Sequence, residues 1–281
     1  MKRAHHDDYG HAATARCERT LITLLGDLGP WRERIYLAGG LAPPYIVSRL
    51  PEGVQPHVGT TDVDLVIGIA VDDAPETYWT LENNLKKSNF RACSPSFRWI
   101  REVDALTVAV EFLCETDAVP HGRIFKPKTE YTGSGLGAFN VRGAQLLTRD
   151  FIEREIEGER LDSGGRSQVT LRVANILPYT VLKIFAFQDR HENKDAYDLV
   201  FCLLHYGEGP RDAGRAASGS PVADEPIVTE ALGLLRRRFA DVAQDGPSAY
   251  AAFLAEPGDE DQAARLRQEA VFVVKEFLDG R

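Results

Sequence analysis

The feature that most restricts the fold of this chain is a short apolar segment carrying two acidic residues, Asp62 and Asp64. The run from Val63 to Ile69 is rich in β-branched and aliphatic residues, which predicts a β-strand. Because side chains alternate along a strand, both carboxylates point to the same face. Two like charges this close are costly to bury unless a positive group lies between them. We therefore expect a divalent cation here, and oxygen ligands favour Mg²⁺, or Mn²⁺ in its place.

A glycine pair, Gly39-Gly40, lies upstream between a predicted strand (35–38) and a short predicted helix (43–50). Glycines at such a turn let backbone N–H groups approach a phosphate, and a helix N-terminus favours an anion. Together with an acidic strand opened by Thr61, the pair indicates phosphoryl or nucleotidyl transfer. The alternative is a tight turn followed by a strand with two solvent-facing acids.

A third acid, Glu111, lies inside the apolar segment 108–113. An acid is uncommon in such a segment, so Glu111 is a candidate functional residue. Beside Asp62 and Asp64 it would complete a metal site or act as a base. Asp104 and Glu115 are rivals by position. The alternative to a catalytic role is that Glu111 lies on an edge strand and faces water.

A second charged set begins at Lys183, amid apolar residues of helical period, so we expect it partly buried near an anion or an acid. Arg190 follows two helical turns later on the same face. Lys194 precedes Asp195 and Asp198, which are one turn apart on the next predicted helix. These residues predict a cationic group for a triphosphate, positioned by acidic neighbours. Alternatively, Lys–Asp pairs tie two helices together.

The order of elements predicts an α+β (α/β) fold. Mixed strands and helices come first, which indicates a mixed sheet with flanking helices over residues 1–174, and a mainly helical part follows over residues 175–281. A hairpin is expected from the strands 97–101 and 106–113. The segment 207–224 is rich in small residues and Pro, which predicts a flexible linker or a disordered loop.

Composition narrows the class of protein. The chain is 43% hydrophobic and 27% charged, and its net charge of −9 argues against bulk nucleic-acid binding, although not against a local basic groove. No apolar stretch is long enough to cross a membrane, and no signal-peptide core is found, so we expect a cytoplasmic protein without a membrane partner. The four cysteines contain no CxxC pair, which argues against zinc and against a disulfide framework.

Three histidines, His5, His6 and His11, cluster near the N-terminus. They could bind a metal. A mobile polar tail is the preferred interpretation.

Several of these motifs resemble those of the AbiEii-type nucleotidyltransferases, toxins related to the MenT toxins within the DNA polymerase β-like nucleotidyltransferase superfamily. The resemblance rests on Gly39-Gly40, on the strand from Thr61 to Leu65, and on Lys183 with the run from Lys194 to Leu199. It covers roughly residues 35–204 and implies a nucleotidyltransferase fold.

The resemblance also implies roles for individual residues. Asp62 and Asp64 would bind the metal, while Gly39 and Gly40 would face phosphate. Lys183 would contact the nucleotide, with Asp195 as its acidic partner. Leu41 stands where the family usually has Ser or Thr. We expect Lys183 and Asp195 to lie across a cleft from the acidic pair.

The implied function is Mg²⁺-dependent transfer of a nucleotide from an NTP substrate to the 3′ acceptor end of tRNA, by a toxin that a cognate antitoxin neutralises. A tRNA partner predicts a local basic surface, for which the candidates are Lys126, Lys128, Arg142, Arg149 and Arg172. Their alternative interpretation is solvated loop charge. Rival functions are an enzyme of the same fold that modifies a protein hydroxyl or a small molecule such as an aminoglycoside, and an inert nucleotidyltransferase-like binding module.

Overall fold

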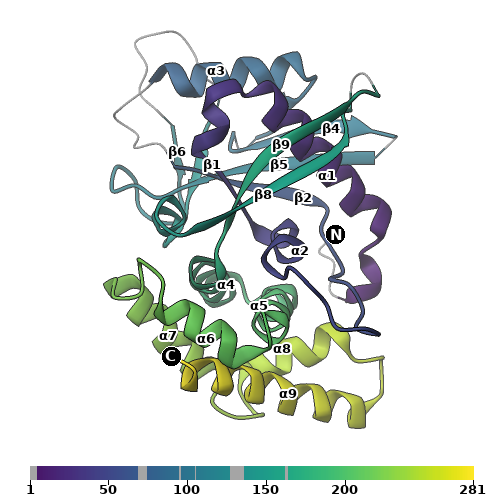
Figure 1. The fold of residues 1–281 in the computed structure, drawn as a ribbon, viewed down its shortest axis with the longest axis vertical. Helices are drawn as coiled ribbons and strands as arrows, with labels where there is room; N and C mark the ends of the chain where they lie inside the picture. Colours follow the sequence, from purple (N-terminus) through teal and green to yellow (C-terminus); the bar gives the residue numbers. More distant parts are fainter. Residues whose placement is uncertain (1–4, 69–74, 95, 105, 127–135, 162–163) are drawn as a thin grey trace. The chain divides into compact units, whose positions relative to one another are not determined.

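A computed structural model describes residues 5–68, 75–94, 96–104, 106–126, 136–161 and 164–281 of the chain (Figure 1). They form two compact units. The sheet unit comprises Gly10–Ala42 and Gly59–Ala174, and the helical unit comprises the N-terminal residues through Tyr9, Pro43–Val58 and Asn175–Arg281. The sequence predicted domains over residues 1–174 and 175–281. In the structure, the residues through Tyr9 and Pro43–Val58 group with Asn175–Arg281.

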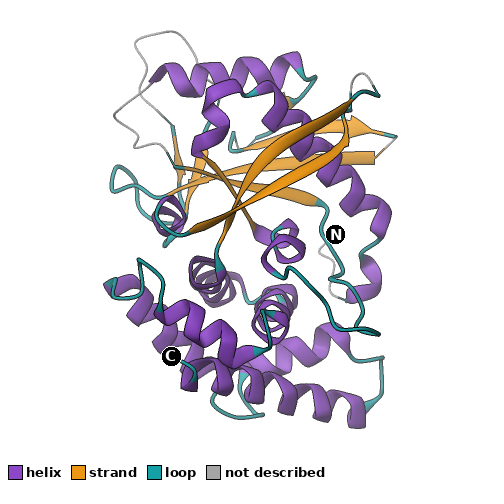
Figure 2. Ribbon diagram, viewed as in Figure 1, coloured by secondary structure: helices purple, strands orange, loops and turns teal. Residues whose placement is uncertain are grey.

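The sheet unit is built around one mixed sheet, which confirms the predicted fold class (Figure 2). Its described strands are β1 (Ile35–Ala38), β2 (Asp62–Ile67), β3 (Arg91–Ala92), β4 (Arg98–Val103), β5 (Leu106–Cys114), β6 (Ile124–Phe125), β7 (Ala138–Asn140), β8 (Phe151–Glu159) and β9 (Arg166–Ala174). The order is β3-β4-β5-β2-β1-β9-β8, and β7 pairs with both β5 and β6. The central strand β2 is antiparallel to β1 and parallel to β5. The predicted hairpin is β4–β5.

The centre of the sheet is apolar on the face that carries Val63 and Leu65. Both side chains are fully buried, and the helix α1 (His11–Asp27) packs on the sheet through contacts with β9, β8 and β5. Helix α3 (Pro75–Lys87) contacts α1 in turn. Asp62 and Asp64 alternate with the buried residues along β2 and are partly exposed.

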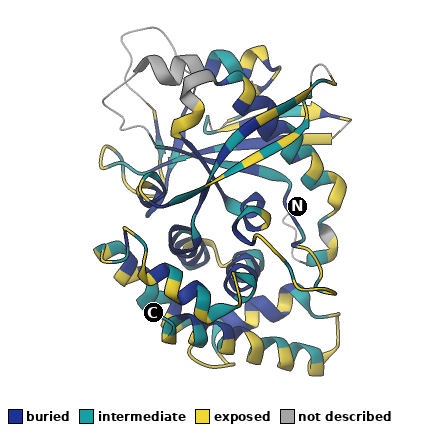
Figure 3. Ribbon diagram, in the orientation of Figure 1, coloured by how far each residue is buried: buried dark blue, intermediate teal, exposed yellow. Residues whose placement is uncertain are grey.

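The helical unit contains α2 (Pro43–Ile46), α4 (Ile176–Arg190), α5 (Asn193–His205), α6 (Pro210–Ser218), α7 (Pro226–Arg238), α8 (Asp245–Leu254) and α9 (Glu260–Asp279). Helices α4 and α5 are its most buried members (Figure 3). The Asn175 side chain caps α4 by accepting a hydrogen bond from the N–H of Ile176. Among the described helices, none is long and apolar enough to cross a membrane.

The predicted linker 207–224 is wrong, because α6 occupies its middle. Ala213, Gly214 and Ala217 are buried, and a Cβ built at Gly214 would overlap the carbonyl oxygen of Phe277 in α9. The small residues thus serve close helix packing, whereas the sequence pattern suggested chain flexibility. Strand β8, whose exposed acids alternate with partly buried residues, was not predicted.

Candidate functional site

Three acidic side chains lie on one face of the central strands. Asp64 of β2 is the ladder partner of Glu111 of β5, and Asp62 lies two residues before Asp64. Ladder partners, and residues two apart on a strand, share a face. All three acids are partly exposed. We call Gly39, Asp62, Asp64 and Glu111 the carboxylate site.

Gly39 joins the carboxylate site because the turn after β1 passes directly over Asp64. Ala38, the last residue of β1, is the ladder partner of Asp64. Gly39 has φ of +64°, and a Cβ built on it would overlap Asp64 Oδ2. Only glycine allows both this backbone conformation and this approach. The adjacent Leu41 is fully buried, so the position that holds a hydroxyl in the resembling family contributes to the core here.

Asp62 is oriented by a residue that the sequence did not single out. Thr60 Oγ1 donates to Asp62 Oδ1 at 2.7 Å, and the N–H of Thr60 donates to Thr14 Oγ1 at 3.1 Å. Thr60 is buried, whereas Thr61, the predicted nucleotide-binding residue, is partly exposed. Two threonines precede the strand in the sequence, but the sequence does not show which of the two hydroxyl groups points toward the acids.

The third acid is next to a cation. Arg98 of β4 is the ladder partner of Glu111, and their side chains form an ion pair at 3.4 Å. The two rival acids have structural partners. Asp104 pairs with Arg19 at 3.2 Å, and Glu115 accepts hydrogen bonds from the N–H groups of Gly143 and Gln145 at 3.0 and 2.9 Å.

The carboxylate site carries negative charge, and the neighbouring thiol of Cys17 is affected by it. Burial, followed by the charges of Asp62 and Asp64, raises the pKa of Cys17 to about 12. Carboxylates that share one face favour a cation between them, and their oxygen donors suit Mg²⁺. Asp62, Asp64 and Glu111 are the residues that would hold it.

The three acids of the carboxylate site do not all come within 4.8 Å of one another, the spacing expected around one ion. Among the described residues, His5, His6 and Asp7 are the group of three or more potential ligands that does. The carboxylate site therefore has the donor atoms that suit a metal ion, but in this structure they lie further apart.

The second predicted set forms a charge cluster in the core of the helical unit. Lys183 Nζ donates to Asp195 Oδ1 at 3.1 Å and to Asp198 Oδ2 at 2.7 Å. Lys194 Nζ donates to both oxygens of Asp198, at 2.7 and 3.0 Å. Arg190 donates twice to Asp195, at 2.6 Å each. Ion pairs from three cations thus connect α4 to α5 and reinforce α5 itself.

His57 completes this buried charge cluster, which we define as His57, Lys183, Arg190, Lys194, Asp195 and Asp198. His57 Nε2 lies 2.8 Å from Asp198 Oδ1, and its ring stacks on Tyr197 with the centroids 5.0 Å apart. Its role could not be predicted from the sequence, because a lone histidine in a loop forms no recognisable pattern.

The pKa values show that the cluster holds its charges. Burial lowers the pKa of Lys183, but the charges of Asp198 and Asp195 outweigh burial and raise it. Burial raises the pKa of Asp198, but Lys183 and Lys194 bring it well below its usual range. For His57 burial dominates over the Asp198 hydrogen bond and lowers the pKa to about 4, so the ring is neutral at neutral pH.

The cations of the cluster differ in access to solvent. The Lys183 side chain is 7% exposed, whereas that of Arg190 is 51% exposed. Lys183 makes the contacts expected if the Lys–Asp pairs join two helices. Arg190 is the cation of the cluster that is most accessible to a phosphate in solvent. Because the carboxylate site and the charge cluster belong to different units, each described by itself, the expected cleft between them stays a prediction.

The basic candidates for RNA binding fall into different settings. Lys126 and Arg149 are exposed, and Arg142 is partly exposed. Arg172 pairs with Glu153 at 3.0 Å, and its guanidinium lies 5.0 Å from the centroid of the Phe151 ring. Lys128 lies outside the described residues.

In comparisons with known proteins, no family model and no curated protein matches this chain.

Proposed function

We propose that the chain is a Mg²⁺-dependent nucleotidyltransferase that uses an NTP. The observation that carries this proposal is the carboxylate site: Asp62, Asp64 and Glu111 share one face, and Gly39 lies against Asp64 in a backbone conformation that favours glycine. An acidic face beside a glycine turn is suited to a cation and a phosphate together.

The proposed chemistry is the displacement of pyrophosphate. An acceptor hydroxyl oxygen forms a bond to the α-phosphorus, the bond from that phosphorus to the β-phosphate oxygen breaks, and pyrophosphate leaves. The hydroxyl proton passes to a carboxylate, for which Glu111 is the candidate. Bound Mg²⁺ would neutralise phosphate charge and orient the triphosphate. Asp62 and Asp64 would hold it, with Thr60 fixing the orientation of Asp62.

The cations of the helical unit have separate proposed roles. Arg190 would neutralise phosphate charge, because half of its side chain is exposed. Lys183, Lys194, Asp195 and Asp198 would position Arg190 and its helix, since Asp195 accepts from both Lys183 and Arg190. This division refines the family-based assignment of Lys183 to the nucleotide.

The proposed acceptor is the 3′ end of tRNA, and the proposed biological role is that of a cytoplasmic toxin neutralised by an antitoxin. These rest on the resemblance of the motifs, supported by the exposed Lys126 and Arg149 in an otherwise acidic protein. The same carboxylate site would also serve a protein hydroxyl or a small-molecule acceptor.

The test is incubation with each of the four α-labelled NTPs and Mg²⁺, with and without total tRNA. We expect label in tRNA from wild-type protein and none from Asp64→Asn, while Asp117→Asn, an exposed acid of the same unit, retains activity. Label in protein or in a small molecule would replace the acceptor but keep the enzyme class. Absence of transfer with every acceptor, despite NTP binding, would support an inert binding module and refute the proposal.

A further inference from the structure

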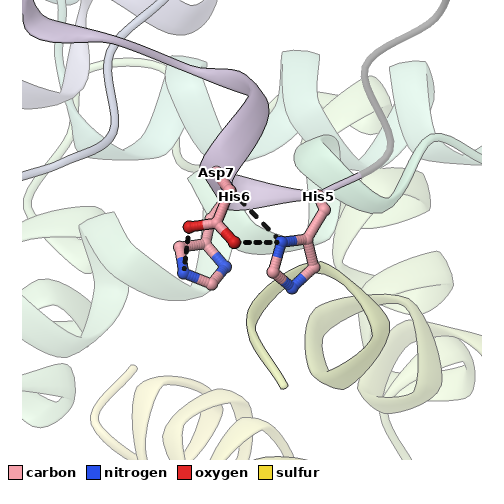
Figure 4. A group of neighbouring side chains, drawn as sticks. All are labelled: His5, His6 and Asp7. Carbon is pink, nitrogen blue, oxygen red and sulfur yellow. Dashed lines mark hydrogen bonds and ion pairs between the residues drawn. The ribbon is translucent and has the colours of Figure 1, made fainter. Parts of the chain in front are cut away.

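Two histidines among the first described residues contact backbone carbonyl groups at the end of α8, and an acid, Asp7, lies between their rings (Figure 4). His5 Nε2 lies 3.0 Å from the carbonyl oxygen of Ala255, and His6 Nδ1 lies 3.2 Å from that of Phe253. Tyr9 adds a ring contact with Phe253, with centroids 5.9 Å apart. The polar tail expected from sequence is thus attached in the structure at residues 5–9.

These contacts fix which nitrogen of each ring carries the proton. A carbonyl oxygen only accepts hydrogen bonds, so His5 Nε2 and His6 Nδ1 must donate. In a neutral imidazole the other nitrogen then carries a lone pair. For His5 this is supported by the N–H of Asp7, which points at His5 Nδ1 from 3.5 Å. Metal-binding histidines are typically held in this way, with the second ring nitrogen donating to a carbonyl or a carboxylate.

Both lone pairs face the carboxylate of Asp7. His5 Nδ1 is 3.3 Å from Asp7 Oδ2, and His6 Nε2 is 3.2 Å from Asp7 Oδ1. Two imidazole nitrogens and a carboxylate thus converge, with one ligand atom from each residue within 4.8 Å of the others. This set of donors is suited to one divalent cation.

We propose that His5, His6 and Asp7 form a Zn²⁺ site. With bonds of about 2.0 Å, ligand atoms on a zinc tetrahedron are about 3.3 Å apart. Each imidazole nitrogen lies at about this distance from one of the two Asp7 oxygens, and one ligand atom from each residue lies within 4.8 Å of the others. Two imidazoles and one carboxylate favour a transition metal over Mg²⁺. The Asp7 side chain is 71% exposed, so an ion can reach it from solvent and water would complete the coordination.

The consequence of this site is a metal-dependent attachment of the N-terminal segment. Its two carbonyl partners, Phe253 and Ala255, lie at the C-terminal end of α8. Binding of Zn²⁺ to the folded protein alone would raise the temperature of unfolding in proportion to ln[Zn²⁺]. The site is separate in ligand chemistry from the carboxylate site, and this proposal does not depend on the proposed enzymatic function.

The test uses untagged, chelator-treated full-length protein titrated with Zn²⁺ by calorimetry, and with Co²⁺ by visible absorption. We expect one bound ion per chain, cobalt bands typical of four ligands, and affinity loss in His6→Ala beyond the roughly 10–100-fold typical of losing a supporting contact. His11→Ala and His121→Ala, exposed histidines elsewhere, serve as matched controls and should bind as wild type does.

A second variant separates ligation from packing. His5→Gln keeps a donor for the carbonyl of Ala255 but removes the ring lone pair, so metal binding should be lost while the metal-free unfolding temperature stays near that of wild type. Wild-type affinity in both His5→Gln and His6→Ala would overturn the proposal, as would Zn²⁺ binding that His11→Ala abolishes. Failure of wild type to bind Zn²⁺ would also overturn it.

Discussion

Asp62 and Asp64 in the sheet unit and Asp195 and Asp198 in the helical unit are both pairs of acids on a shared face, yet their surroundings differ. Asp195 and Asp198 are each about 1% exposed and are neutralised by Lys183, Lys194 and Arg190. Asp62 and Asp64 are partly exposed, and their negative charge reaches as far as the thiol of Cys17.

Burial and neighbouring cations thus determine whether a pair of carboxylates is available to a ligand. A charge buried with its counter-ions stabilises a particular arrangement of helices, and removing one partner leaves another charge buried and unpaired. A pair of acids on an open face retains its capacity to attract a cation from solution. We therefore propose Mg²⁺ binding for the carboxylate site and structural positioning for most of the charge cluster.

The largest expected effect is the loss of activity in the carboxylate site. Asp62→Asn and Asp64→Asn should each reduce nucleotide transfer on the order of 10⁴-fold, or about 5 kcal/mol, because a metal ligand is lost. The free energy of unfolding, measured with urea, should change by less than about 1 kcal/mol, since neutralising one acid relieves repulsion. A large loss of stability instead would make the two acidic pairs equivalent.

The buried charge cluster should respond in the opposite way. Asp198→Asn should lower the free energy of unfolding by about 4 kcal/mol, because Lys183 and Lys194 lose their shared counter-charge. Glu260→Gln, whose partner Arg267 lies 3.6 Å away on the exposed side of α9, is the matched control and should stay within about 0.5 kcal/mol. Equal effects in the two variants would contradict the structural role.

Stability should also depend on pH through His57. Its pKa is about 4 in the folded protein and 6.5 when unperturbed, so between these values the unfolded chain binds a proton that the folded chain does not. Stability is then fully present above pH 6.5 and falls as the pH is lowered, by about 3 kcal/mol in total at about 1.4 kcal/mol per unit.

The measurement for His57 is urea unfolding of wild type and of His57→Gln between about pH 7 and pH 4.5. The glutamine keeps an N–H donor for Asp198, so the difference between the two curves isolates the ring from other groups, such as His205, whose pKa burial also lowers. Asp198 itself loses its stabilising charge only below its ordinary value of 3.8. Parallel curves would show that the ring is not the titrating group.

Gly39→Ala tests whether close approach to Asp64 matters beyond backbone conformation. We expect a loss of about 2 kcal/mol in stability and at least a tenfold loss of transfer, because the new methyl displaces the Asp64 carboxylate. The matched control is Gly122→Ala, which has φ of +76° with no atom within 4 Å of the new methyl. It should show the backbone cost of about 1 kcal/mol with full activity.

The smallest expected effect concerns the acceptor. Lys126→Glu in the sheet unit should weaken tRNA binding several-fold, about 1 kcal/mol, and reduce the slope of log affinity against log salt by about 1. Lys275→Glu, at an exposed position of α9 in the helical unit, is the control for net charge. Identical curves for the two variants would remove Lys126 from the RNA-binding surface.

Local patterns accounted for most elements. The apolar periods predicted β1, the β4–β5 hairpin and a mainly helical part after residue 174, since such periods depend on near neighbours in the chain. They failed at α6, where small residues allow contact with α9, and at β8, whose pairing with β9 depends on residues far along the chain. Long-range packing leaves no local period to detect.

Strand and helix geometry are local, so the amino-acid sequence alone places Asp62 and Asp64 on one face and predicts helices for the segments that carry Lys183, Arg190, Lys194, Asp195 and Asp198. The pairing of Asp64 with Glu111, the orientation of Asp62 by Thr60 and the contact of His57 with Asp198 arise from tertiary packing. So do the contacts of His5 and His6 with carbonyl groups at the C-terminal end of α8. Strand register, burial and desolvation depend on groups distant in sequence, and they set whether a charge is available to a ligand or already neutralised.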